Sequence, residues 1–165
     1  MREDEVYVGT KIWFKKIGFI PLAGQPPNGC DNIPTIEIKE IKNLEKGSKG
    51  SFKPDLVFGN PSYLVLVECK PLDDKLDELK LLEVLSNKDR QRLLYDEIVQ
   101  RGIFKRKKLD EHFSSFEIFT SKLRVCLSHG GEPRLMEKVM TLKLDSMNGN
   151  GTLTPPTNPD CSISY

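Results

Sequence analysis

The sequence lacks the features of membrane and disulfide-rich proteins. No apolar run approaches the roughly 20 residues that a membrane-spanning helix needs. The first 16 residues are too acidic and too poor in apolar residues for a signal peptide. The four cysteines have no Cys-x-x-Cys spacing, so we do not expect a structural zinc site, and Cys69 and Cys126 lie in apolar runs that suit reduced thiols. We therefore expect the cytoplasm or another reducing intracellular compartment, and no membrane.

The chain has almost no net charge, and it lacks several common catalytic motifs. Lysine and arginine total 25 and aspartate and glutamate 24, so any binding of nucleic acid must depend on local basic patches. There is no phosphate-binding Gly-Lys-Ser/Thr motif, and Ser, His and Asp form no recognisable triad order. The histidines, His112 and His129, stand alone and receive no role.

Hydrophobic periodicity predicts an α/β protein. The chain is 38% apolar and 30% charged, which is typical of one globular domain, expected over 1–145. Residues 146–165 have no periodic apolar face, so we expect a disordered or loosely packed tail. Helices are expected over 3–17, 73–85, 89–102 and 132–144, and strands over 35–43, 52–58, 63–71, 116–119 and 123–128. This order predicts a mixed central β-sheet flanked by helices.

The segment FKPDLVFGNPSYLVLVECKP, residues 52–71, places charges inside two apolar strands. If the strands form a hairpin centred on Pro61 and Ser62, Asp55 lies directly opposite Glu68. Opposed residues point to the same face with Cβ atoms about 4.5–5.5 Å apart. Lys70, two residues beyond Glu68, projects from that face too.

These charges need a physical reason, because the second strand is apolar on both sides and reads as a central, covered strand. Two carboxylates this close repel each other unless a cation lies between them. Lys70 can supply part of that charge, and Mg²⁺, with Mn²⁺ as a substitute, suits carboxylate oxygens better. The other interpretation is a surface salt-bridge cluster with a structural role.

The pattern of Pro54-Asp55 followed by Glu68-Cys69-Lys70 resembles the PD-(D/E)XK nuclease superfamily. The resemblance implies a restriction-endonuclease-like core with αβββαβ order. It also implies an Mg²⁺-dependent endonuclease, a hydrolase in which Asp55, Glu68 and the backbone carbonyl of Cys69 bind metal and Lys70 is catalytic. Members typically add an acidic residue from the first helix. Glu5 is the first candidate here, and Glu3 competes with it.

Further substrate contacts are expected from three places. Gln91 and Tyr95 match the Gln-x-x-x-Tyr motif of RecB-like and lambda-exonuclease-like branches, in which the pair positions substrate. Lys49 and Lys53, in the loop before Asp55, are candidate phosphate contacts. The basic clusters FKRKK (104–108) and KIWFKK (11–16) are others, because nucleic-acid affinity comes largely from such contacts.

The sequence therefore favours a metal-dependent nuclease that hydrolyses phosphodiester bonds, a DNA endonuclease of restriction or repair type. A nuclease acting from ends is a variant, and RNA stays open as substrate. The alternative is a catalytically inactive nucleic-acid-binding or assembly module with the same fold. The expected partner is nucleic acid, DNA in the first place, and a homodimer is compatible with the chain.

Overall fold

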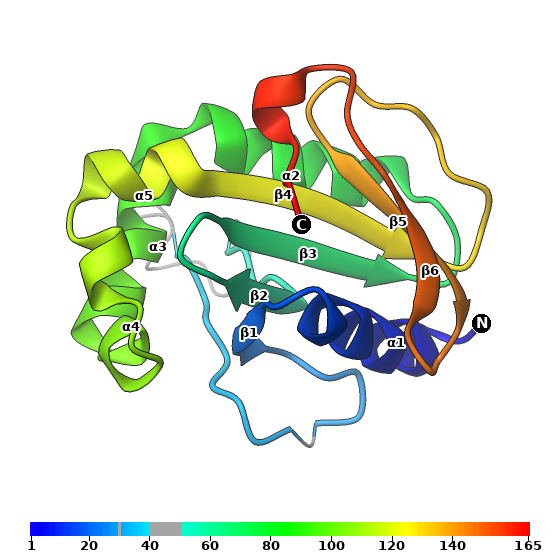
Figure 1. The fold of residues 1–165 in the computed structure, drawn as a ribbon, viewed down its shortest axis with the longest axis horizontal. Helices are drawn as coiled ribbons and strands as arrows, with labels where there is room; N and C mark the ends of the chain where they lie inside the picture. Colours follow the sequence, from blue (N-terminus) through cyan, green and yellow to red (C-terminus); the bar gives the residue numbers. More distant parts are fainter. Residues whose placement is uncertain (30, 40–50) are drawn as a thin grey trace.

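A mixed β-sheet runs through the protein, in a computed structural model that describes residues 1–29, 31–39 and 51–165 (Figure 1). In this part of the chain the sheet has six strands, ordered β1-β2-β3-β4-β5-β6. The strands are β1 (Ile20–Gly24), β2 (Leu56–Gly59), β3 (Leu64–Lys70), β4 (Leu123–His129), β5 (Met140–Ser146) and β6 (Asn150–Thr154). The helices are α1 (Glu3–Lys16), α2 (Lys75–Ser86), α3 (Lys88–Gln100), α4 (Ile103–Arg106) and α5 (Phe116–Lys122), with short 3₁₀ turns at Asp110–Phe113 and Pro159–Cys161.

The strand directions make the sheet mixed. Strands β1, β2 and β3 are antiparallel neighbours, β3, β4 and β5 are parallel, and β6 is antiparallel to β5. The β2–β3 hairpin has the predicted register, with Val57 opposite Leu66 and Gly59 opposite Leu64. The prediction of an α/β fold with a mixed sheet and flanking helices is confirmed at this level.

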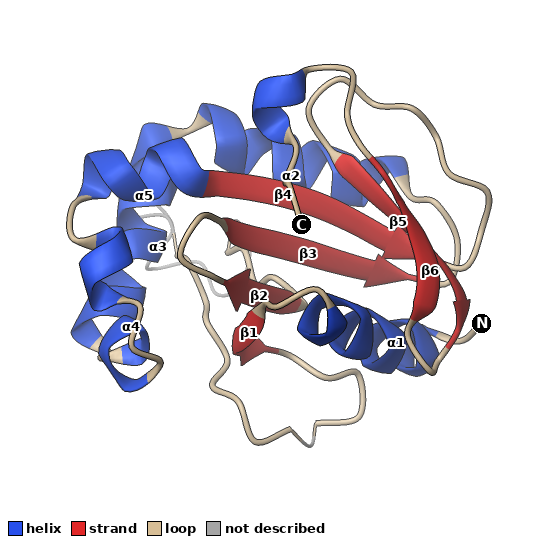
Figure 2. Ribbon diagram, viewed as in Figure 1, coloured by secondary structure: helices blue, strands red, loops and turns tan. Residues whose placement is uncertain are grey.

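Helices cover both faces of the sheet, which gives the protein two apolar cores (Figure 2). Helix α1 packs on one face, against apolar side chains that include Phe58, Val65 and Val67. Helices α2, α3 and α5 pack on the other, against a core that includes Leu64 and Leu66. Strand β3 is buried from both sides, as its unbroken apolar sequence predicts.

Three predicted helices are confirmed as α1, α2 and α3. Gly18, with φ of +90°, follows the end of α1. Asn87 separates α2 from α3 and caps α3, because its side chain accepts hydrogen bonds from the backbone N–H groups of Asp89 and Arg90.

The predicted strand at 116–119 is wrong, since these residues begin α5. The Ser115 side chain caps the helix by accepting a hydrogen bond from the backbone N–H of Ile118. The helix buries Phe119 against Phe104 and Phe113. Local capping and an aromatic cluster from distant residues therefore override the β-propensity of the segment.

The predicted helix at 132–144 is also wrong. Residues from Met140 onward form β5, and Met140, Leu142 and Leu144 all enter the core beneath α1. Their period of two is the strand signal, and pairing with β4 satisfies it.

Two expectations about less regular segments also change. Residues 150–154 of the expected tail form β6, which pairs with β5, and Ile163 is buried beside α1. The first strand of the sheet is Ile20–Gly24. The strand predicted at 35–43 is represented by a single bridge between Ile38 and Phe52, and residues 40–43 lie outside the described part.

Within the described residues, no helix is long and apolar enough to cross a membrane.

Candidate active site

The β2–β3 hairpin brings Asp55 to the end of β3 that carries Glu68 and Lys70. Leu56 pairs with Val67, so Asp55, one residue before Leu56, continues the register toward Glu68. One oxygen of Asp55, Oδ2, accepts a hydrogen bond of 2.8 Å from the backbone N–H of Cys69. This bond fixes the Asp55 carboxylate beside the strand end and needs only one of its two oxygens.

The Glu68 carboxyl group is buried and incompletely paired. Glu68 is 4% exposed, and its Oε1 has no hydrogen-bond partner among the described residues. Burial, reinforced by the nearby charges of Asp55 and Asp77, raises the pKa of Glu68 to about 8. The site therefore holds a carboxyl oxygen that needs either a proton or a cation.

The pKa of Asp55 is also raised, but less strongly than that of Glu68. Burial raises the pKa of Asp55 to about 6, while the Cys69 N–H and the Lys70 charge act against that rise. Asp55 and Glu68 thus form a pair of acids in which each charge disfavours the other.

Lys70 lies at the end of β3 and bridges two elements. Its Nζ is 3.3 Å from Glu3 Oε1 on α1 and 3.7 Å from Asp77 Oδ2 on α2. Burial alone would lower the pKa of Lys70, but the surrounding carboxylates, Asp77 first, outweigh it and raise that pKa to about 12. Lys70 therefore stays positively charged.

Two residues of α2 complete the cluster, and sequence reasoning missed both. Asp77 is 2% exposed, an unusual position for a helix aspartate, and its Oδ1 accepts a hydrogen bond of 2.5 Å from Lys80 Nζ. The i, i+3 spacing of Asp77 and Lys80 was visible in the sequence, but it is common on solvated helices. Only the packing of α2 on the sheet brings the pair to the site.

The acidic residue that α1 contributes is Glu3. Glu5, the first candidate, instead accepts a hydrogen bond of 2.8 Å from the backbone N–H of Arg2 and pairs with the Arg2 side chain. This is the capping-box arrangement of a helix start. The structure thus places Glu3, and not Glu5, against Lys70.

Side chains alone supply few possible metal ligands at this strand end. Among the described residues, no group of three or more His, Cys, Asp and Glu side chains is arranged to hold a metal ion. The Cys69 thiol lies in the core under α1, so only the backbone of Cys69 faces Asp55. Asp55 and Glu68 are the carboxylates that the β2–β3 hairpin brings together, whereas Glu3 and Asp77 pair with Lys70. Backbone carbonyls and water would have to supply further ligands.

Gln91 and Tyr95 lie elsewhere and have structural contacts. Gln91 Nε2 donates to the carbonyl oxygens of Val84 and Leu85 at the C-terminal end of α2, whereas Asp77 lies near its start. The Tyr95 hydroxyl donates to the Phe113 carbonyl, and its ring packs on the α5 aromatics. Their expected role in substrate positioning receives no support from this placement.

The expected phosphate contacts are not gathered at the site either. Lys53 pairs with Glu37, and Lys49 lies outside the described residues. The basic residues at 105–108 precede Leu109, which lies against Gly59 and therefore beside the start of β3. Lys70 is at the opposite end of that strand.

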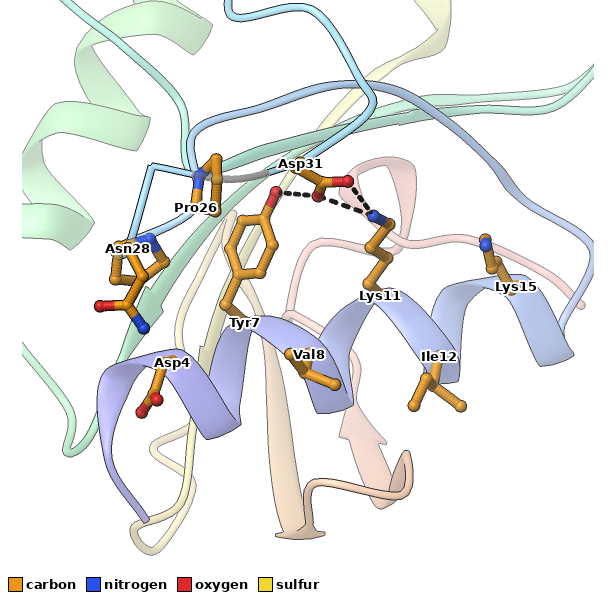
Figure 3. Close-up of a pocket in the computed structure, with 10 residues that line it drawn as sticks. Asp4, Tyr7, Val8, Lys11, Ile12, Lys15, Pro26, Asn28 and Asp31 are labelled. Carbon is orange, nitrogen blue, oxygen red and sulfur yellow. Dashed lines mark hydrogen bonds and ion pairs between the residues drawn. The ribbon is translucent and has the colours of Figure 1, made fainter.

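A separate hollow of about 380 Å³ lies between α1 and the loop at 26–31 (Figure 3). Three of its polar groups, those of Tyr7, Lys11 and Asp31, pair with one another. Both Asp31 oxygens accept hydrogen bonds of 2.7 Å from Lys11 Nζ, and Oδ2 also accepts 2.8 Å from the Tyr7 hydroxyl. Lys11 and Tyr7 thus tie the loop to α1, which is a structural role.

The comparisons with known proteins add no relative. No family model, no curated protein and no solved structure matches the chain.

Proposed function

We propose that the protein is a metal-dependent nuclease of restriction-endonuclease-like fold, an endonuclease that hydrolyses phosphodiester bonds in DNA. The observation that carries the proposal is the Glu68 carboxyl group, which is buried beside Asp55 and whose Oε1 has no hydrogen-bond partner among the residues that the structure describes. A carboxyl group buried for a purely structural reason is expected to have its polar atoms hydrogen-bonded. A buried acid with an open oxygen beside a second acid is the arrangement expected of a cation site.

The charges of the cluster support a divalent cation. Four carboxylates, those of Glu3, Asp55, Glu68 and Asp77, lie around two ammonium groups, those of Lys70 and Lys80. When all are ionised, two negative charges remain uncompensated. One divalent cation balances them, and hard oxygen donors favour Mg²⁺ or Mn²⁺.

The donors at the strand end fit such an ion. Asp55, Glu68 and the backbone carbonyl of Cys69 would hold it, and two carboxylates suffice because Mg²⁺ usually retains several water ligands in proteins. When bound, the ion would polarise the phosphodiester and favour ionisation of an attacking water.

Asp55, Glu68 and Lys70 each have a defined part in the proposed reaction. Asp55 is held in place by the Cys69 N–H, and Glu68 supplies its open oxygen to the metal. Lys70 remains charged and is fixed by Glu3 and Asp77, so its ammonium group can meet negative charge that develops on the phosphate.

The arrangement of elements supports the same proposal. The chain runs α1, β1, β2, β3, then helices, then β4, which contains the αβββαβ order implied by the family resemblance. The acidic pair lies on the β2–β3 hairpin and the lysine ends β3. A nuclease that acts from DNA ends receives less support, because Gln91 and Tyr95, the residues of its motif, contact α2 and Phe113 instead of the site.

The test is incubation of the protein with circular DNA, linear DNA and RNA, each with Mg²⁺ or with EDTA. The proposal predicts Mg²⁺-dependent nicking or linearisation of the circle. Glu68→Gln should lose this activity, whereas Lys88→Ala, which removes an exposed lysine at the first residue of α3, should retain it. Binding of nucleic acid without cleavage under every condition would favour the inactive binding module. Neither binding nor cleavage would refute both.

A further inference from the structure

Lys80 is the most exposed cation of the site. Its side chain is 55% exposed, against 25% for Lys70, while its Nζ is anchored on the buried Asp77. The contact with Asp77 fixes the position of the Lys80 ammonium group, while more than half of the Lys80 side chain stays accessible to solvent. Lys80 is therefore more accessible than Lys70 to an anion that approaches from solvent.

Lys80 and the catalytic candidate Lys70 both lie near the Glu68 carboxyl group and favour its ionised form. Of the two lysines near Glu68, Lys80 has the larger electrostatic effect on that carboxyl group. Lys70, by contrast, is held between Glu3 and Asp77. The two ammonium groups therefore share one partner, Asp77, and differ in accessibility, with the Lys80 side chain more exposed than that of Lys70.

We propose that Lys80 is a phosphate contact of the site and that Asp77 is the positioning residue that aims it. The inference rests on the proposed function, because it assigns the substrate phosphate to a residue of that site. It gives to Lys80 a role that the sequence favoured for Lys49 and Lys53. The bound group is a backbone phosphate of a nucleic-acid strand, contacted through charge and without reading the base sequence.

A single phosphate contact has a measurable signature. Each phosphate neutralised on duplex DNA contributes about −0.9 to the slope of log K against log salt concentration. Lys80→Ala should therefore weaken binding about equally for all sequences and make that slope shallower by about one. In cleavage assays it should raise KM with kcat nearly retained, since the contact exists before and during the reaction.

The experiment measures binding of a fluorescent DNA duplex by anisotropy across a salt series. Ca²⁺ replaces Mg²⁺, and a gel checks that the duplex stays intact. The variants are Lys80→Ala, Lys80→Gln, which keeps a long side chain without the charge, and Lys80→Arg, which keeps the charge. Lys88→Ala is the matched control, since it removes one exposed lysine at the start of α3, beyond the C-terminal end of α2. Melting curves verify that each variant is folded.

The expected result is a shallower slope for Lys80→Ala and Lys80→Gln, with the wild-type slope for Lys80→Arg and Lys88→Ala. If Lys80→Ala or Lys80→Gln keeps the wild-type slope while the wild type binds and cuts DNA, the inference is wrong and the proposed function stands. If Lys88→Ala makes the slope as shallow as Lys80→Ala does, the effect is one of net charge and the inference is again wrong. A wild type that binds no nucleic acid overturns both.

Discussion

At the scale of single residues, the response of the site to protons depends on Glu68. Its carboxyl group is buried near Asp55 and Asp77, and Oε1 has no hydrogen-bond partner in the described part of the chain. In the unfolded chain the same group ionises near its ordinary pKa of 4.5, whereas the folded protein holds the proton to about pH 8. Folding therefore favours the protonated form, and a bound cation would favour the ionised one.

The first prediction concerns the pH dependence of stability without metal. Between these pKa values the unfolded state binds fewer protons, so the free energy of unfolding falls as pH rises. This stabilisation is fully present below pH 4.5 and is lost as pH rises through 8. Glu68→Gln removes the titration, so its melting temperature in EDTA should exceed that of the wild type at pH 9, by about 2–4 °C for each kcal/mol relieved.

Thermal melts of both proteins in EDTA from pH 5 to 9 measure this difference. A constant gap between wild type and variant across the range would show that Glu68 is already ionised and paired at pH 5. In that case the open-oxygen account of the site fails.

Sequence reasoning found part of this chemistry for a local reason. The facing of Asp55 and Glu68 follows from hairpin register, which a short loop fixes. Asp77 and Lys80 could not be found that way, because only the docking of α2 brings them to β3. The choice between Glu3 and Glu5 depended on the helix cap, where Arg2 takes Glu5.

At the scale of elements, turns and caps explain both the successes and the errors. Asn87 interrupts two periodic segments, and Gly18 follows α1, so these boundaries were readable. The β5–β6 hairpin was missed although Asn148-Gly149 is a strong hairpin signal. Strand β6 has only five residues and is an edge strand with exposed polar residues, which gives a weak periodic pattern.

The second prediction uses two glycines with the same backbone requirement. Gly149 and Gly18 have φ of +71° and +90°, where an L residue costs about 1–2 kcal/mol. A Cβ at Gly149 would also lie 2.6 Å from Ile12 Cγ2 and 2.9 Å from the backbone nitrogen of Trp13. No described atom lies within 4 Å of a Cβ built at Gly18.

Gly149→Ala should therefore lower the midpoint of urea unfolding more than Gly18→Ala, which shares the strain but not the clash. Equal midpoints for the two variants would mean that the β5–β6 turn does not press against α1.

At the scale of the whole molecule, the C-terminal residues belong to the fold. Strand β6 completes the sheet, Ile163 enters the core under α1, and the Tyr165 ring meets that of Trp13 at 5.6 Å. The chain thus closes over its own first helix, which carries Glu3. The sequence could not show this, because the apolar residues of the segment are few and their partners lie more than 100 positions away.

The third prediction is that deletion of residues 147–165 destabilises the protein. The deletion removes the partner strand of β5 and exposes apolar side chains under α1, at about 25 cal/mol for each Å² uncovered. Differential scanning calorimetry should give a clearly lower melting temperature. Removing Tyr165 alone, whose exposed fraction is 69%, should have a small effect. An unchanged melting temperature for the long deletion would show that the segment is dispensable.

The central claim is that the strand end of the β2–β3 hairpin is catalytic, and Lys70→Ala tests it most directly. Asp77 keeps Lys80 as a partner when Lys70 is removed, so the loss of stability should be small. If Lys70 instead served only to hold buried carboxylates together, its loss would cost roughly 3–5 kcal/mol of stability.

The decisive measurement is the rate of Mg²⁺-dependent DNA cleavage by Lys70→Ala, with the melting temperature recorded on the same sample. The account predicts that the rate falls by a factor on the order of a hundred or more, while the melting temperature stays close to that of the wild type. A destabilised variant that cuts DNA at the wild-type rate would contradict it.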